Sequence, residues 1–176
     1  MRSEALDRIE LVFTLFDVNG NGHLEADDFD MMAERVVEAA PQAGAAAKNA
    51  MHDACKRYWS TLVRELDTDG DDRVSLDEFS ACVLSPERFD DTLTDFAEAL
   101  AALGDPDGDG LIDRPDFVAL MTAIGFEFDN TIALFDAFGP NAGDQVRVIT
   151  WIEGIKDYYS PDKAGIAGDH LVSTPA

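Results

Sequence analysis

Apolar side chains recur along most of the chain every three or four residues, the spacing that places them on one face of an α-helix. Polar stretches rich in Asp, Asn and Gly interrupt this pattern, and it resumes after each of them. The pattern predicts an all-α fold of eight helices with almost no sheet. The residues expected on the inner faces are, in chain order, Ile9, Val12, Phe13 and Phe16; Phe29, Met32, Ala33 and Val36; Trp59, Leu62, Val63 and Leu66; Phe79, Cys82 and Val83; Phe89, Leu93, Phe96, Leu100 and Leu103; Phe117, Leu120, Met121 and Ile124; Ile132, Phe135 and Phe138; Trp151, Ile152 and Ile155.

Local signals at the helix ends agree with this division. Small polar residues favour helix starts, proline favours the first turn, and glycine favours the position just past the end. The expected boundary residues are Ser3 for the first helix, Ala26 for the second, 47 and 66 for the third, Ser85-Pro86 for the fifth, Gly125 for the sixth, Asp129 for the seventh and Ser160-Pro161 for the eighth.

The polar stretch from Asp105 to Asp116 is the most informative interruption. It carries carboxylates at positions 1, 3, 5, 9 and 12 of twelve residues, with Gly110 at position 6 and Ile112 at position 8. Ca²⁺ takes six to eight oxygen ligands, and a short chain can supply them only by turning around the ion. Glycine at position 6 permits the positive φ that this turn requires. We therefore interpret the stretch as an EF-hand calcium loop.

The motif occurs twice more, at 17–28 and 67–78, and each copy is followed at once by a phenylalanine. Repetition between apolar-striped helices argues against three unrelated Asp-rich turns. Each loop is expected to bind Ca²⁺ through side chains at positions 1, 3, 5 and 12 and the backbone carbonyl at position 7. The candidate ligands are Asp17, Asn19, Asn21, His23 and Asp28 in loop one; Asp67, Asp69, Asp71, Arg73 and Glu78 in loop two; and Asp105, Asp107, Asp109, Leu111 and Asp116 in loop three.

The three loops differ at the positions that set ion preference. Loop two alone ends in a glutamate, Glu78, which can bind with both oxygens, but Asp72 at its position 6 must take a positive φ under strain. Loops one and three end in Asp28 and Asp116, which are one methylene shorter, so 17–28 and 105–116 would also suit six-coordinate Mg²⁺. Glu25, at position 9 of loop one, is expected to add charge directly or through water.

A fourth, degenerate loop spans 139–150. It has Gly139 and Thr150 where the anchoring carboxylates belong, Asp144 where the turn glycine belongs, and Asn141 as its one plausible ligand. We expect this loop to bind no ion. The sequence therefore predicts three Ca²⁺ ions per chain.

Apolar residues at position 8 are expected to join the loops in pairs. Leu24 should pair with Val74, and Ile112 with Val146, in two short antiparallel ribbons. Such cross-strand pairs would let the fourth loop support the third without holding an ion of its own.

The composition fits a cation-binding protein. A net charge of −23 over 176 residues argues against nucleic acid or an anionic membrane as partner, and 46% hydrophobic residues argue against disorder. No apolar run could span a bilayer and the N-terminus lacks a signal-peptide segment, so we expect a cytoplasmic monomer. Cys55 and Cys82 are expected to be buried free thiols. Because no Ser-His-Asp, Cys-His or phosphate-loop arrangement appears, we predict a protein that is not an enzyme.

The loops and their spacing resemble those of the sarcoplasmic calcium-binding protein family, including its bacterial calerythrin-like members. The resemblance covers about residues 3–159, and the loop starts lie 50, 38 and 34 residues apart, unlike the near-even spacing of calmodulin-type proteins. It implies two EF-hand pairs packed into one globule. We expect an N-terminal pair at 1–84, a C-terminal pair at 85–160 and a tail at 161–176.

Three functions are compatible with these features. The favoured hypothesis is a Ca²⁺ buffer or transporter, because inner faces of Phe and Leu and only five methionines suit a closed core. The first alternative is a sensor that exposes an apolar surface to an unknown target protein. The second is binding of an apolar small molecule, with Tyr58, Trp59 and Trp151 lining the cavity, as photoprotein relatives of the fold enclose a cofactor.

Overall fold

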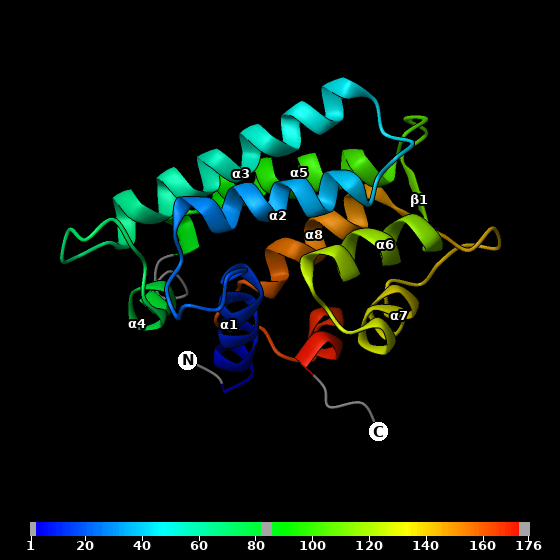
Figure 1. Ribbon diagram of the computed structural model, residues 1–176. Helices are drawn as coiled ribbons and strands as arrows, with labels where there is room; N and C mark the ends of the chain where they lie inside the picture. Colours follow the sequence, from blue (N-terminus) through cyan, green and yellow to red (C-terminus); the bar gives the residue numbers. More distant parts are fainter. Residues whose placement is uncertain (1–2, 82–85, 173–176) are drawn as a thin grey trace.

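The computed structural model describes residues 3–81 and 86–172, and within them the fold is almost entirely helical (Figure 1). Eight α-helices, two three-residue strands and two 3₁₀ turns follow one another along these ranges. The elements are α1 (Ser3–Phe16), α2 (Ala26–Glu38), α3 (Ala45–Leu66), α4 (Leu76–Ser80), η2 (Pro86–Arg88), α5 (Asp90–Gly104), β1 (Leu111–Asp113), α6 (Arg114–Ile124), α7 (Phe128–Ala137), β2 (Gln145–Arg147), α8 (Val148–Tyr158) and η3 (Ala167–Val172). The predicted fold class is confirmed.

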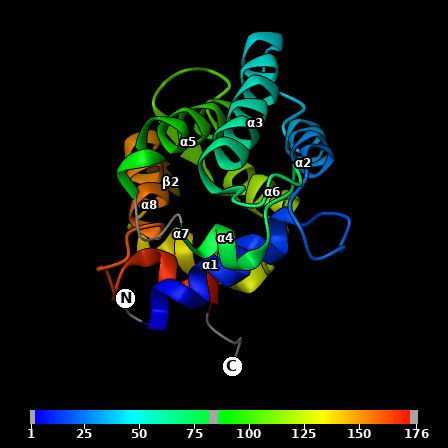
Figure 2. The same ribbon diagram turned by 90° about the vertical axis from the view of Figure 1, so that its left-hand side faces the viewer.

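Both halves of the chain contribute to one hydrophobic core. Helices α2, α3 and α5 lie on one side of the molecule, α1, α7 and η3 lie on the opposite side, and α6 and α8 lie between them (Figures 1 and 2). Aromatic rings connect the halves: the ring of Tyr58 on α3 lies 5.7 Å from that of Phe16 on α1 and 5.4 Å from that of Phe96 on α5. The four helix–loop–helix units therefore share a single core that holds the loops at its edges.

The two predicted ribbons are present in the predicted register. Leu24 and Val74 form an antiparallel bridge with backbone N–H to carbonyl distances of 2.9 and 3.0 Å. Ile112 pairs with Val146 at the centre of the β1–β2 sheet, between Leu111–Arg147 and Asp113–Gln145. All four position-8 side chains are buried, so each loop pair is anchored to the core through its middle.

The inner face of α3 differs from the expectation. Tyr58 is buried, whereas Trp59 and Val63, which were predicted to face inward, are only half-buried. The spacing from Met51 through Cys55 to Tyr58 and Leu62 continues one stripe over three turns. That longer stripe, rather than the four apolar residues nearest the loop, sets the rotation of the helix.

Three helix boundaries also differ from the expectation. The third helix begins at Ala45 rather than near 47, and after the short η2 turn that starts at Pro86 the fifth begins only at Asp90. The seventh begins at Phe128 with Glu127 at its N-cap, so Asp129 lies in the first turn and is not the cap. As a result α7 buries Thr131, Leu134 and Phe135, while Ile132 and Phe138 remain half-buried.

Some expectations fall on residues outside the described ranges. Cys82, Val83 and Ser85 belong to this group, and so does the side chain of Ser3. Cys55 is buried and free, as predicted. Burial, and then the charge of Asp30, raises the pKa of its thiol to about 12, so this thiol stays protonated and unreactive at neutral pH.

The segment after α8 is part of the packed structure. Its 3₁₀ turn η3 lies against α1 and α7, and Leu171 is only 6% exposed. Arg8 of α1, with no exposed surface, donates from Nε to the carbonyl of Tyr158 at 2.7 Å and from Nη1 to Asp169 at 2.6 Å. Its second terminal nitrogen donates to the carbonyls of Ser160 and Lys163. The segment from 158 to 169 is therefore held against α1 by one buried guanidinium.

Among the helices in the described ranges, none is both long and apolar enough to cross a membrane.

Candidate metal centres

Loops one to three share one backbone arrangement around the residue at position 1. In each loop a carboxylate oxygen at position 1 accepts the backbone N–H of position 6: Asp17 from Gly22 at 2.7 Å, Asp67 from Asp72 at 3.1 Å and Asp105 from Gly110 at 3.0 Å. A side-chain oxygen at position 5 accepts the N–H of position 7 in all three, at 3.0, 2.9 and 2.8 Å. These contacts curl the loops so that their oxygens face a common centre.

Carboxylates converge in loops two and three. Oxygens of Asp67, Asp69 and Asp71 lie within 4.8 Å of one another, and those of Asp105, Asp107 and Asp109 do the same. The negative charge of Asp71, followed by partial burial, raises the pKa of Asp69. Three anionic groups at this spacing repel one another, and a divalent cation of the size of Ca²⁺ relieves the repulsion. The donor set therefore fits a calcium ion.

In loops one and two, the side chain at position 12 is held by backbone N–H groups on both flanks of the loop. Asp28 accepts from Asn19 at 3.2 Å and from Glu25 at 2.9 Å, and Glu78 accepts from Thr68 at 2.9 Å and from Ser75 at 3.0 Å. These bonds, that from Ser75 first and that from Thr68 next, lower the pKa of Glu78 to about 2. The glutamate is thus fixed in place and ionised at any physiological pH.

Asp116, at position 12 of loop three, lies in a different environment. It is half-buried, and burial first and the charge of Asp113 second raise its pKa. A carboxylate destabilised in this way gains from a cation placed next to it. The loop-three geometry is therefore compatible with ligation through Asp116, although its side chain is the short one.

Lengthening Asp116 by one methylene tests what sets the ion preference of loop three. In Asp116→Glu the carboxylate can bind the ion with both oxygens, so we expect the Ca²⁺ affinity relative to Mg²⁺ to rise by about tenfold at this loop. Calorimetric Ca²⁺ titration with and without excess Mg²⁺ measures the ratio. Asp129→Glu, which lengthens an exposed carboxylate in the first turn of α7, outside the loops, is the control. A ratio unchanged in Asp116→Glu contradicts the assignment of position 12.

Position 6 of loop two shows the predicted strain. Asp72 has φ 60°, in the left-handed region where Gly22 and Gly110 lie at 86° and 83° in the other two loops. Aspartate tolerates this region better than most residues because its short side chain bonds locally. The turn is therefore kept without glycine.

The carboxylate of Glu25 is bonded to two other side chains and is therefore not free to add charge to an ion site in loop one. One of its carboxylate oxygens accepts from the Asn21 amide at 2.7 Å, and the other lies 2.8 Å from Nε of Arg73 on loop two. Arg73 contributes this side-chain bridge in addition to the backbone carbonyl that the sequence indicated. Sequence reasoning did not find the bridge, whose signal is an opposite charge at position 9 of one loop and position 7 of the next.

Loop four keeps its form by other contacts. The Asn141 side-chain oxygen accepts the N–H groups of Gly143 at 2.8 Å and Gln145 at 3.2 Å, and Asp144 takes φ 61° at position 6. Asn141 thus closes the turn as the residue at position 3 does in loop one, but Gly139 and Thr150 stand where the other loops have anchoring carboxylates. Within the described ranges, the acidic clusters suited to a metal lie in loops two and three and not here.

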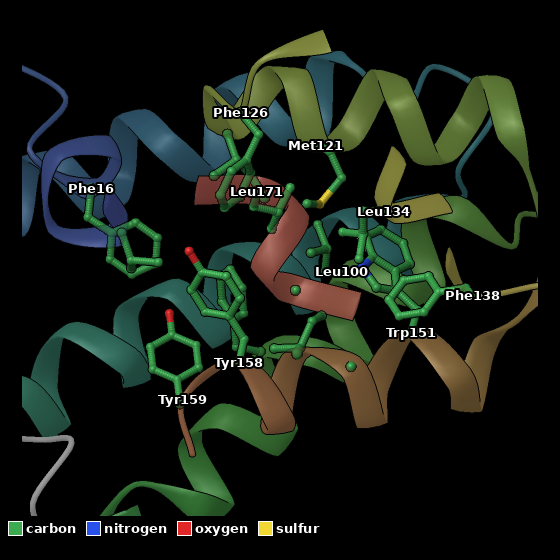
Figure 3. Close-up of a pocket in the computed structure, with 16 residues that line it drawn as sticks. Phe16, Leu100, Met121, Phe126, Leu134, Phe138, Trp151, Tyr158, Tyr159 and Leu171 are labelled. Atoms are coloured by element: carbon green, nitrogen blue, oxygen red, sulfur yellow. The ribbon is translucent and has the colours of Figure 1, made fainter. Parts of the chain in front are cut away.

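An apolar pocket of about 60 Å³ lies in the middle of the core (Figure 3). Trp151 lines it, and its indole nitrogen is buried with no hydrogen-bond partner among the described residues. Tyr58 lines a second cavity of about 220 Å³ instead, and Trp59 lines neither, contrary to expectation. Pockets for cofactor-sized ligands measure roughly 300–1,000 Å³. Both cavities are smaller than this, which weakens the small-molecule hypothesis.

Comparisons with known proteins agree with this geometry. A sequence model described as an EF-hand domain pair matches residues 6–84. Calerythrin of Saccharopolyspora erythraea is 24% identical over 162 residues, covering 88% of this chain and 92% of calerythrin.

Two solved structures share the fold along nearly their whole length. A calcium-binding protein of Streptomyces coelicolor, described in connection with prokaryotic calcium-mediated regulation, superposes with a TM-score of 0.75 at 26% identity and covers 89% of this chain and 98% of its own. A sarcoplasmic calcium-binding protein of amphioxus superposes with a TM-score of 0.70 at 19% identity, covering 99% of this chain and 100% of its own.

Proposed function

We propose that this chain, which is similar to calerythrin and has the fold of the sarcoplasmic calcium-binding proteins, is a cytoplasmic calcium buffer and not an enzyme. Calcium is bound in loops one to three, through the side chains and position-7 carbonyls assigned above. Loops one and three, which end in aspartate, also accept Mg²⁺. The chain acts as a monomer, with its pairs at 1–84 and 85–160 as the two structural halves.

The observation that carries this proposal is that the segment 161–172 covers the apolar core. A sensor opens its helices and presents an apolar groove to a target. Here η3 packs over the central pocket, which its Leu171 lines. The side-chain amide of Asn130 on α7 donates to the Leu171 carbonyl at 3.1 Å. With Arg8 holding the same segment from α1, opening would break a set of buried polar contacts. A closed core suits ion storage.

The exposure of apolar surface on ion binding tests the proposal. We expect a fluorescent dye that binds apolar surface to show less than a twofold change in emission when Ca²⁺ replaces chelator. A chain that ends at residue 160 is the matched control, because removal of the cover should raise dye binding several-fold. A large Ca²⁺-induced rise in the full chain would overturn the buffer role and favour a sensor.

A sensor is the second candidate, and one comparison favours it. The similar protein of Streptomyces coelicolor is described in connection with calcium-mediated regulation. A regulatory role here requires that the segment 161–172 leave the core when the ions bind, so that a target protein can take its place. The dye measurement therefore separates the two candidates.

A further inference from the structure

Arg114 forms a dense set of contacts with the ion-free fourth unit. Its Nε donates to one oxygen of Asp144 at 2.8 Å and its Nη2 to the other at 2.7 Å, so the pair is bidentate. The same Nη2 donates to Asp136, at the end of α7, at 2.8 Å. The guanidinium carbon also lies 4.4 Å from the centroid of the Phe135 ring. Two carboxylates and one aromatic face thus surround this cation.

The backbone of Arg114 holds the same partner. Its N–H donates to the carbonyl of Asp144 at 3.4 Å, and across the ribbon the N–H of Val148 donates to the carbonyl of Gly110 at 2.9 Å. Arg114 is the residue directly after β1 and the first residue of α6, so it connects loop three to the helix that carries Asp116. Loop four is therefore bonded to the backbone on both sides of β1, at Gly110 and at Arg114. A shift of loop four would move both of these flanks of the loop-three site.

Electrostatics favours a cation at this point. Asp144 stands at position 6 of loop four in a left-handed turn, and the loop has no carboxylate at position 1 or 12 to hold a metal. The hydrogen bonds from the guanidinium lower the pKa of Asp144, so this carboxylate is charged opposite the arginine. Arginine stays charged at all physiological pH values and matches a carboxylate with two parallel bonds.

We propose that the Arg114 guanidinium is a built-in cation for the fourth EF-hand unit, which orders loop four without calcium and thereby positions loop three to bind its ion. Arg114 is a positioning residue, since it acts on the ion through Asp144, the β1–β2 ribbon and α6. The proposal rests on the proposed assignment of an ion to loop three.

Among the described residues, the N-terminal pair contains no equivalent of this arginine. Position 10 is Ala26 in loop one and Leu76 in loop two, and neither can donate a hydrogen bond from its side chain. There the cross-loop bridge from Arg73 to Glu25 joins two loops that both carry ion-binding motifs. The C-terminal pair has one loop with an ion-binding motif, loop three. The guanidinium takes the place of the missing ion in loop four, so that loop four is already ordered when Ca²⁺ binds to loop three.

The sign of the effect on calcium affinity separates this proposal from plain electrostatics. Removing a positive charge near a Ca²⁺ site strengthens the attraction between the site and the ion. Loss of positioning has the opposite effect, because the ion must then also order the ribbon. We expect Arg114→Gln to bind Ca²⁺ at loop three about tenfold more weakly.

Arg147→Gln is the matched control. Arg147 is exposed on β2, opposite Leu111 of loop three, and its side chain forms no hydrogen bond or ion pair with the described residues. Its replacement removes the same charge from the same ribbon but leaves the contacts between Arg114 and Asp144 in place. We expect Ca²⁺ affinity at loop three to be unchanged or slightly higher in this variant.

The measurement is an NMR Ca²⁺ titration that follows the backbone amide of Gly110, which is bonded to Asp105 inside loop three. If this amide does not respond to Ca²⁺ in the unaltered chain, the loop-three assignment fails. If it responds, and Arg114→Gln binds as tightly as Arg147→Gln or more tightly, the positioning role of Arg114 fails. In chelator, the backbone amide of Asp144 should move toward its random-coil chemical shift in Arg114→Gln but not in Arg147→Gln.

A second variant guards against misfolding of the first. Arg114→Lys keeps the charge but cannot form the two parallel bonds to Asp144. We expect its loop-three affinity to fall between those of the unaltered chain and Arg114→Gln, with loops one and two unaffected. An affinity equal to that of the unaltered chain would show that charge alone suffices and would overturn the proposal.

Discussion

Replacing Glu78 by glutamine is expected to abolish calcium binding in loop two and to lower the stoichiometry from three ions to two. Glutamine keeps the volume but loses the charge and the second anionic oxygen, and the ion depends on both. The backbone N–H groups of Thr68 and Ser75 already orient the Glu78 carboxylate. Because the loop is built around this side chain, a neighbouring residue does not compensate for the loss of its charge. Calorimetric titration counts the ions.

Asp77→Asn is the control for this result. Asp77 lies next to Glu78 in the first turn of α4 and is exposed, so its replacement removes the same charge without removing a proposed ligand. We expect three ions to remain. A stoichiometry of three in Glu78→Gln as well would show that the ligands of loop two have been assigned incorrectly.

Arg8→Met is expected to lower the free energy of unfolding by about 3–5 kcal/mol, since the buried guanidinium makes an ion pair with Asp169 and three hydrogen bonds to backbone carbonyls that methionine cannot replace. Asp169 would lose its cation, and the carbonyls of Tyr158 and Ser160 would lose their donor. Methionine fills much of the space of the aliphatic stem, so the loss measures the polar contacts. Urea unfolding in saturating Ca²⁺ gives the value.

An exposed ion pair of the same type provides the comparison. Arg57 and Asp95 lie 3.2 Å apart with side chains 58% and 47% exposed, and such pairs contribute about 0–1 kcal/mol. Arg57→Met should therefore hardly change the unfolding midpoint. Equal losses in the two variants would mean that the guanidinium of Arg8 does not fasten the C-terminal segment.

The sequence predicted those parts of the structure that depend on local spacing. Ile112 and Val146 were predicted to pair because position 8 of a loop has only one neighbour within reach, and the register follows from the loop length. The inner face of α6 was predicted for a similar reason, since its apolar residues form one stripe that Gly125 ends with φ 119°.

The features that escaped prediction depend on contacts between distant residues. Arg8 lies among the apolar residues of α1 at a spacing that faces inward, but only the folded chain places Asp169 beside it. Arg114 looks like an ordinary first-turn residue until Asp144, thirty positions later, is brought to its guanidinium. The rotation of α3 was misjudged because Tyr58 and Trp59 are both aromatic and packing against Phe16 and Phe96 decides between them.

The bonds between Arg8 and the segment after α8 affect when this part of the protein can finish folding during synthesis. Arg8 leaves the ribosome well before its partners, which lie 150 to 161 positions later in the sequence. Domains usually fold from the N-terminus as they emerge. In this protein, the guanidinium of Arg8 on α1 must instead stay in water while the loops that follow it in the sequence form. The nascent chain therefore completes this packing only after residue 169 has left the exit tunnel.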